Sequence, residues 1–174
     1  LGMSPLELSQ RLLSAEAKVD STRARNGRLE PDDWSKISRA IGRLGEQKYY
    51  PLLFDALARI RELDWTLDIL GDGPLLEPLQ RQAHRLGIAD RVTFHGFAPD
   101  PLPFLTRAHA LVLSSAWEGQ GAVLLEALAC GCPVIATRST PAVGDVLGVG
   151  RFGTLVPPGE ARSLGAGIAP ALGF

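Results

Sequence analysis

The sequence predicts an α/β protein whose Rossmann-like parallel sheet carries helices on both faces. From Ile37 onward, short apolar runs alternate with segments of helical spacing. The apolar runs are nearly continuous, which is typical of strands buried on both sides of a parallel sheet. Right-handed crossovers make such a sheet doubly wound, and ligands bind at the carboxyl ends of its strands. Function is therefore sought in the loops that follow the strands.

Short apolar runs define the strands, and apolar residues three or four positions apart define the helices. The first domain helix, for example, carries Leu53, Leu57 and Ile60 on one face. Glycine at 87 and 131 is expected to close two helices, because it adopts the left-handed conformation readily. Strands are expected at residues 37–44, 65–70, 91–95, 110–114, 133–137 and 153–156, and helices at 51–63, 75–86, 103–107, 122–130 and 160–172. The loops at the ligand-facing edge are then 43–48, 71–74, 96–101, 114–121 and 138–145.

The first 35 residues lack a strand-like run and predict a helix followed by a linker. The sequence from Ser4 to Glu7 is typical of a helix start, because Ser4 can cap, Pro5 suits the first helical position and Glu7 completes a capping box. Residues 21–35 are polar and contain turn signals. The chain thus divides into a helix and linker at residues 1–35 and one domain at residues 36–174.

Composition excludes several classes of function. The 174 residues contain 18 Lys and Arg against 19 Asp and Glu, a net charge of −1. This balance argues against nucleic-acid binding through bulk positive charge and against a polybasic membrane anchor. No apolar run is long enough to span a membrane, and the charged N-terminus does not resemble a secretory signal, so a cytoplasmic protein is expected. The cysteines, Cys130 and Cys132, are too few for a zinc site and are expected to pack in the core.

The strongest chemical pattern is a two-glycine loop, residues 114–121, between a predicted strand and a predicted helix. The first amides of that helix have no intrahelical partners and carry about half a positive charge. Gly119 and Gly121 allow a ligand to approach the backbone closely. This combination indicates a site for a diphosphate or a polar sugar.

Two carboxylates accompany the loop. Glu126 is the only charged residue of an otherwise apolar helix, and burying it would cost several kcal/mol unless it were paired. The two hydroxyls of a ribose would satisfy it. Glu118 lies eight positions earlier and could reach other hydroxyls of the same ligand. The alternative is that Glu118 is solvated and Glu126 points outward.

Cations follow the first predicted strand, in the sequence from Gly42 to Lys48. Arg43 can bind a phosphate through two hydrogen bonds, and Lys48 can act as a point charge. The alternative is ordinary surface charge. His95 ends another strand at the ligand-facing edge and is a further candidate ligand contact. Motifs for a dinucleotide domain, a P-loop and a serine nucleophile elbow are absent from the sequence.

Taken in order, these residues resemble the C-terminal domain of GT-B glycosyltransferases of family 4, the retaining group that uses nucleotide sugars. The resemblance runs from about Ile37 to about Leu164. Glu118 and Glu126 fit the family's E-x7-E pattern. The other motifs are Gly42-Arg43-Leu44 with Lys48, Gly71-Asp72-Gly73, Val92–Phe97, Cys130–Ala136 and Gly153–Pro158.

The resemblance implies catalytic roles for Glu118, Arg43 and Lys48. Arg43 and Lys48 would bind the donor diphosphate and stabilise charge on the departing β-phosphate. Glu118 would hold the donor sugar together with the backbone amides of Gly119, Gln120 and Gly121.

The resemblance also implies how the nucleoside is bound. Glu126 would bind the ribose hydroxyls, Val123 and Leu124 would flank the nucleoside, and the loop at Phe97 and Ala98 would meet the base. No metal and no other cofactor is expected, because the helix dipole and the cations neutralise the leaving diphosphate.

The implied function is that of a donor-binding domain. It would serve a retaining glycosyltransferase of polysaccharide biosynthesis that transfers a sugar from a UDP- or GDP-sugar to a glycan or lipid-linked acceptor. The family's first, N-terminal GT-B domain is an expected partner, because residues 1–35 are too short to form it. We expect the chain alone to be incomplete as a transferase, with peripheral membrane association through the full-length enzyme and with no nucleic-acid partner.

The sequence departs from the family pattern at Tyr49, and it allows two alternative functions. Tyr49 follows Lys48 where the family often has glycine, so a different local turn is expected. The alternatives are a non-catalytic GT-B-like module for assembly or regulation and a sugar-nucleotide epimerase of GT-B shape.

Overall fold

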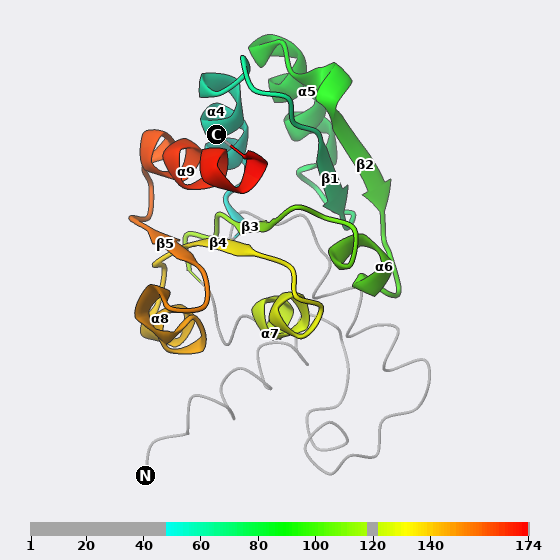
Figure 1. Ribbon diagram of the computed structural model, residues 1–174. Helices are drawn as coiled ribbons and strands as arrows, with labels where there is room; N and C mark the ends of the chain where they lie inside the picture. The colour runs from blue at the N-terminus through cyan, green and yellow to red at the C-terminus, as the bar shows by residue number, and fades with distance from the viewer. Residues whose placement is uncertain (1–47, 118–121, 174) are drawn as a thin grey trace, which may run out of the picture.

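Two parallel sheets form the centre of the described part of the protein (Figure 1). The computed structural model describes residues 48–117 and 122–173. β1 (Leu67–Leu70) pairs with β2 (Val92–Gly96), with Leu67 opposite Val92. The second sheet has the order β3 (Leu111–Leu113), β4 (Val134–Thr137), β5 (Thr154–Val156). Every one of these pairings is parallel, as the sequence predicts.

The predicted strand at residues 37–44 lies outside the described residues.

The helices follow the strands in alternation. The α-helices are α4 (Tyr50–Arg59), α5 (Leu76–Leu86), α6 (Leu102–Leu105), α7 (Ala122–Ala129), α8 (Pro141–Val146) and α9 (Ala161–Ile168). Short 3-10 turns are η2 (Ala89–Arg91), η3 (Gly148–Gly150) and η4 (Ala169–Leu172). The predicted closing glycines are confirmed, because Gly87 and Gly131 have φ of 68° and 69°.

Helices cover both faces of the second sheet, which confirms the predicted layering. β4 is buried throughout, and its side chains alternate between two apolar clusters. Ile135 joins the cluster that includes residues of α4 and α9, whereas Val134 and Ala136 join the cluster under α7 and α8. Figure 1 shows these two pairs of helices on opposite sides of the sheet.

Small residues let α9 approach its neighbours closely. A Cβ atom on Gly167 would lie 2.9 Å from Cγ1 of Val156, and one on Gly165 would lie 3.2 Å from the carbonyl oxygen of Ala56. Glycine at these positions therefore allows α9 to pack against both β5 and α4.

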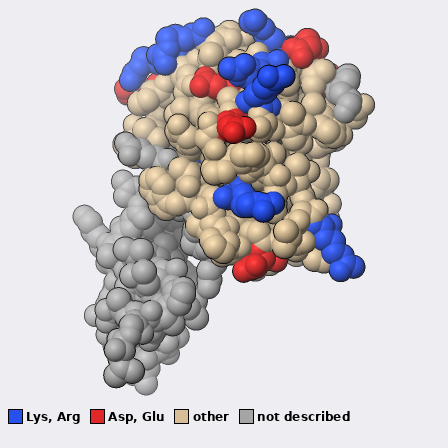
Figure 2. Space-filling model, turned by 90° about the vertical axis from the view of Figure 1, so that its left-hand side faces the viewer, with Lys and Arg blue, Asp and Glu red and all other residues tan. Residues whose placement is uncertain are grey.

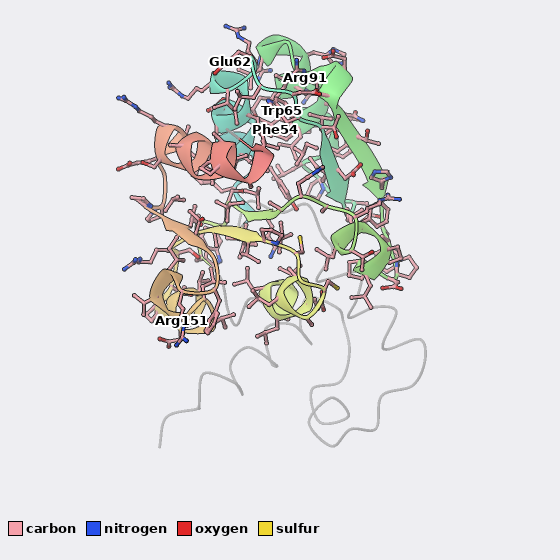
Figure 3. The ribbon with its side chains drawn as sticks, viewed as in Figure 1. Phe54, Glu62, Trp65, Arg91 and Arg151 are labelled. Carbon is pink, nitrogen blue, oxygen red and sulfur yellow. The ribbon has the colours of Figure 1, made fainter. Side chains whose placement is uncertain are left out.

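Trp65 closes the amino end of β1. Its indole is 4% exposed and donates from Nε1 to the carbonyl oxygen of Ile60 (3.1 Å). The Arg91 guanidinium lies over the ring, 5.2 Å from its centroid, and donates to the carbonyl oxygen of Leu63 (2.8 Å). Figure 3 shows Trp65 and Arg91 side by side at this end of the molecule, near Phe54.

One predicted loop is wrong and two predicted helices end four residues early, the first of them being the helix expected at 51–63, which ends as α4 at Arg59. Residues 138–145 were expected as a loop, but α8 begins there at Pro141, after Thr140 in the extended conformation of an N-cap. The Thr-Pro pair is the signal that could have revealed it, because proline suits the first helical position. The helix expected at 160–172 ends as α9 at Ile168 and continues only as the turn η4.

Candidate functional site

A hydrogen bond joins two of the predicted ligand-facing loops. Ser114, which follows β3, donates from Oγ to the carbonyl oxygen of Lys48 over 2.7 Å. The two residues are far apart in the sequence, and Ser114 is 3% exposed. The half-buried Lys48 therefore lies at the carboxyl end of β3, as the sequence predicts for a cation at the ligand-facing edge.

Buried hydroxyl groups hold the carboxyl ends of β3 and β4 together at this edge of the sheet. Thr137, the last residue of β4, donates from Oγ1 to the carbonyl oxygen of Ser115 (2.6 Å) and lies 3.3 Å from that of Leu113. Thr137 and Ser115 are fully buried. Sequence reasoning missed this role and weighed the serines only as nucleophiles. The available signal was the small hydroxyl residue at the end of each of two neighbouring strands.

A second pair of loops meets at the ends of β1 and β2. The amide of Gly71 donates to the carbonyl oxygen of Gly96 over 2.7 Å, and both glycines have positive φ. The half-buried Phe97 and Ala98, predicted to meet a base, follow directly. The loops at 71–74 and 96–101 therefore share the same edge of the sheet.

His95 is held by neighbouring side chains. Its Nε2 lies 2.6 Å from Oδ1 of Asp68 on the adjacent strand, and its ring makes an edge contact with Phe104, with centroids 4.9 Å apart. These contacts tie α6 to β1 and β2. The predicted contact of His95 with a ligand remains a prediction.

Helix α7 presents Glu126 to solvent. Glu126 is exposed on the same stripe as Ala122, Leu125 and Ala129, so its carboxylate carries no burial cost. Of the two residues predicted to flank a nucleoside, Leu124 is fully buried in the core and Val123 is half-buried. Val123 is therefore the member of this pair whose side chain has exposed surface.

Five predicted site residues lie outside the described residues. They are Arg43, Glu118, Gly119, Gln120 and Gly121. Their roles stay predictions.

Residues 48–117 and 122–173 contain no group of three His, Cys, Asp or Glu side chains that could hold a metal ion. Within the same ranges no helix is both long and apolar enough to cross a membrane.

Cys132 is buried in the core as predicted. Burial raises the pKa of its thiol, and a backbone hydrogen bond at Leu111 partly offsets this rise. Figure 2 shows basic and acidic side chains interspersed over the described part of one face.

The sequence from residue 23 to residue 172 matches the family model of glycosyl transferases group 1. The chain belongs to this family. The curated relatives include an N-acetylgalactosaminyltransferase of Campylobacter jejuni, named as acting on N-acetylgalactosamine-N,N'-diacetylbacillosaminyl-diphospho-undecaprenol. It is 31% identical over 137 residues, which is 79% of this chain and 37% of the relative. The chain therefore spans little more than a third of that relative's length.

Solved glycosyltransferase structures share the fold. The lipopolysaccharide outer core galactosyltransferase WaaB is 33% identical with a TM-score of 0.68, over 76% of this chain and 38% of WaaB. HepE of Anabaena, solved with UDP, is 28% identical with a TM-score of 0.67, over 83% of this chain and 44% of HepE. The group 1 chain thus has the Rossmann-like fold of a GT-B C-terminal domain.

Proposed function

We propose that this group 1 domain binds the donor of a retaining glycosyltransferase, which transfers a hexose from a UDP- or GDP-sugar to a glycan or lipid-linked acceptor. The hydrogen bond from Ser114 to Lys48 (2.7 Å) carries the proposal. It brings Lys48 to the end of β3, the strand that precedes α7, and so supports our assignment of Lys48 and Glu126 to one site. The UDP complex of HepE supports a nucleotide-sugar ligand.

The charges at this edge suit a nucleoside diphosphate. Lys48 supplies a positive charge, and the N-terminus of the eight-residue helix α7 adds the partial positive charge of its free amides. The Glu126 carboxylate only accepts hydrogen bonds, and ribose hydroxyls can donate them. We assign the diphosphate to Lys48 with Arg43, and the ribose to Glu126.

Transfer requires charge stabilisation at the leaving group. As the bond from the sugar to the β-phosphate breaks, negative charge grows on the phosphate oxygens, and Lys48 and Arg43 stabilise it electrostatically. Glu118 and the amides of residues 119–121 hold the sugar in this proposal. The cations and helix amides supply the charge that a metal would otherwise provide, and the acceptor site is assigned to an N-terminal GT-B domain.

Calorimetry with UDP and with GDP tests the proposal. We expect one of the two to bind, and both Glu126→Ala and the double change of Arg43 and Lys48 to alanine to weaken binding about tenfold or more, because each removes charge-assisted hydrogen bonds. Glu77→Ala is the matched control, since Glu77 is an exposed carboxylate on α5. A folded chain that binds neither nucleotide contradicts the proposal.

A non-catalytic role in assembly is a second candidate, favoured by exposed apolar side chains. Leu125 on α7 is 57% exposed and Leu102 on α6 is 45% exposed. Sedimentation that shows a dimer without ligand, dissociated by Leu125→Glu, would support assembly. A monomer that binds nucleotide would support donor binding and contradict the assembly role.

A further inference from the structure

Tyr49 adopts a backbone conformation that disfavours its residue type. Its φ and ψ are 48° and 43°, in the left-handed region, directly before α4. Glycine adopts this conformation without strain, whereas a side chain with a Cβ atom does not. The conformation is therefore the one that glycine would favour, although the residue is tyrosine. Tyr49 is nevertheless 40% exposed, so packing of the ring in the core does not account for the strain.

Trp117 is a second exposed aromatic residue at the same edge. It follows β3 by four residues, in the segment that leads to α7, and is 55% exposed. An exposed indole leaves a large, rigid apolar surface in water, which a ligand with an apolar face can cover.

Hydrogen bonds hold the backbone at Tyr49 and the backbone two to three residues before Trp117. The bond from Ser114 to Lys48 (2.7 Å) joins the residue before Tyr49 to the chain three residues before Trp117. The carbonyl oxygen of Ser115 is held by Thr137 (2.6 Å), and that of Tyr49 accepts from the amide of Leu52 (3.0 Å). Aromatic side chains on fixed backbone lose little conformational freedom when a ligand covers them.

We infer that Tyr49 and Trp117 form an aromatic platform for the ring of a hexose, beside the phosphate-binding Lys48. A pyranose ring has an apolar C–H face that can cover an aromatic ring, while its hydroxyls stay available for polar contacts. The strain at Tyr49 then serves to place its ring at the site, a known use of strained backbone. This inference rests on the proposed donor-binding function, and the hexose is that of the donor, because the acceptor site is assigned to an N-terminal GT-B domain.

Binding of nucleotides with and without a hexose tests the platform. The probes are UDP, GDP, UDP-glucose, UDP-galactose and GDP-mannose, followed by methyl α-hexosides added with UDP or GDP present. The variants are Tyr49→Gly and Trp117→Ala, with Tyr49→Phe and Trp117→Phe to keep a ring. We expect the first two to weaken binding of a hexose-containing ligand about tenfold, to change nucleotide binding less than about twofold, and the phenylalanine variants to retain most of the affinity. Loss with the nucleotide sugars is the expected result, and loss with the methyl hexosides alone would overturn the assignment of the hexose to the donor.

Thermal unfolding separates the platform from a structural role. Tyr49→Gly relieves strain and is expected to raise the unfolding temperature by about 2–4 °C while it weakens hexose binding. Val149→Gly is the matched control, because Val149 also has positive φ (55°), is 72% exposed and lies before the amino end of β5. It should raise the unfolding temperature without changing any affinity.

Two results overturn the platform. The first is unchanged hexose binding in both Tyr49→Gly and Trp117→Ala. The second is a wild-type protein that binds UDP or GDP but whose affinity does not rise when the ligand carries a hexose. This result would leave the proposed binding of the donor nucleotide intact. A folded wild type that binds no nucleotide overturns the proposed function, and the platform with it.

Discussion

Two tryptophans at opposite ends of the strands have opposite environments. Trp65, before β1, is 4% exposed, donates a hydrogen bond and is covered by Arg91. Trp117, after β3, is 55% exposed. The amino end of β1 is thus closed by packing, whereas the segment that follows β3 leaves an indole open to solvent. We therefore expect the packed end of β1 to stabilise the fold and the segment after β3 to take part in binding.

The largest expected effect is at the closed end. Trp65→Ala removes a buried indole and a hydrogen bond to Ile60, so we expect the free energy of unfolding to fall by about 3–5 kcal/mol. Trp117→Ala should change it by less than about 0.5 kcal/mol. Urea unfolding of both variants checks the contrast. Equal losses would show that the two ends do not differ in this way.

Close packing of α9 provides the next largest effect. Gly167→Ala places a Cβ atom 2.9 Å from Val156 and should destabilise the protein by about 1–3 kcal/mol. Gly144→Ala on α8 is the control, because a Cβ atom there meets nothing within 4 Å. It should stabilise by about 0.4–1 kcal/mol. The same sign for both variants in urea unfolding would contradict this packing.

Ser114→Ala tests the hydrogen bond at the carboxyl end of β3. It breaks the bond to the Lys48 carbonyl oxygen, so we expect a loss of about 1 kcal/mol in stability and weaker binding of UDP or GDP. Ser163→Ala, which removes an exposed bond to Glu160, is the control and should leave both quantities nearly unchanged. Unfolding and calorimetry on both variants measure the effects. Unchanged nucleotide affinity in Ser114→Ala would separate Lys48 from the site.

The smallest expected effect concerns the cysteines. Burial raises the pKa of the Cys132 thiol, so the folded state keeps this proton to higher pH than the unfolded state does. Stability from this group is therefore complete below the unfolded pKa of about 8.5 and falls as pH rises above it. Unfolding at several alkaline pH values should show this slope in wild type and not in Cys132→Ala. At pH 8, iodoacetamide should modify the half-buried Cys130 before Cys132.

The sequence could predict the fold because apolar periodicity is local. Alternation of strands and helices places β1 to β5 and most helices within a few residues of their observed bounds. The sequence did not predict helix α8, because Gly144 and Asp145 within it are typical of loops. Packing of Val143 and Leu147 in the core stabilises this helix.

Contacts between distant segments at the site could not be predicted in the same way. The sequence indicates the loop that carries Lys48 and the loop that leads into the helix of Glu126, since the carboxyl ends of parallel strands share one edge. The hydrogen bond that the Lys48 carbonyl oxygen accepts from Ser114, however, forms only when these distant segments fold together. The exposure of Glu126 likewise depends on the rotation of α7 about its axis, which buries Leu124 and Ala127 in the core.

Hydrogen exchange with and without UDP or GDP tests most directly which end binds. We predict slower amide exchange on adding nucleotide in peptides covering residues 48–54, 96–98 and 122–129. Exchange at residues 60–65 and 89–91, around Trp65 and Arg91, should stay the same. Protection confined to the amino end would contradict a binding site at the carboxyl ends of the strands.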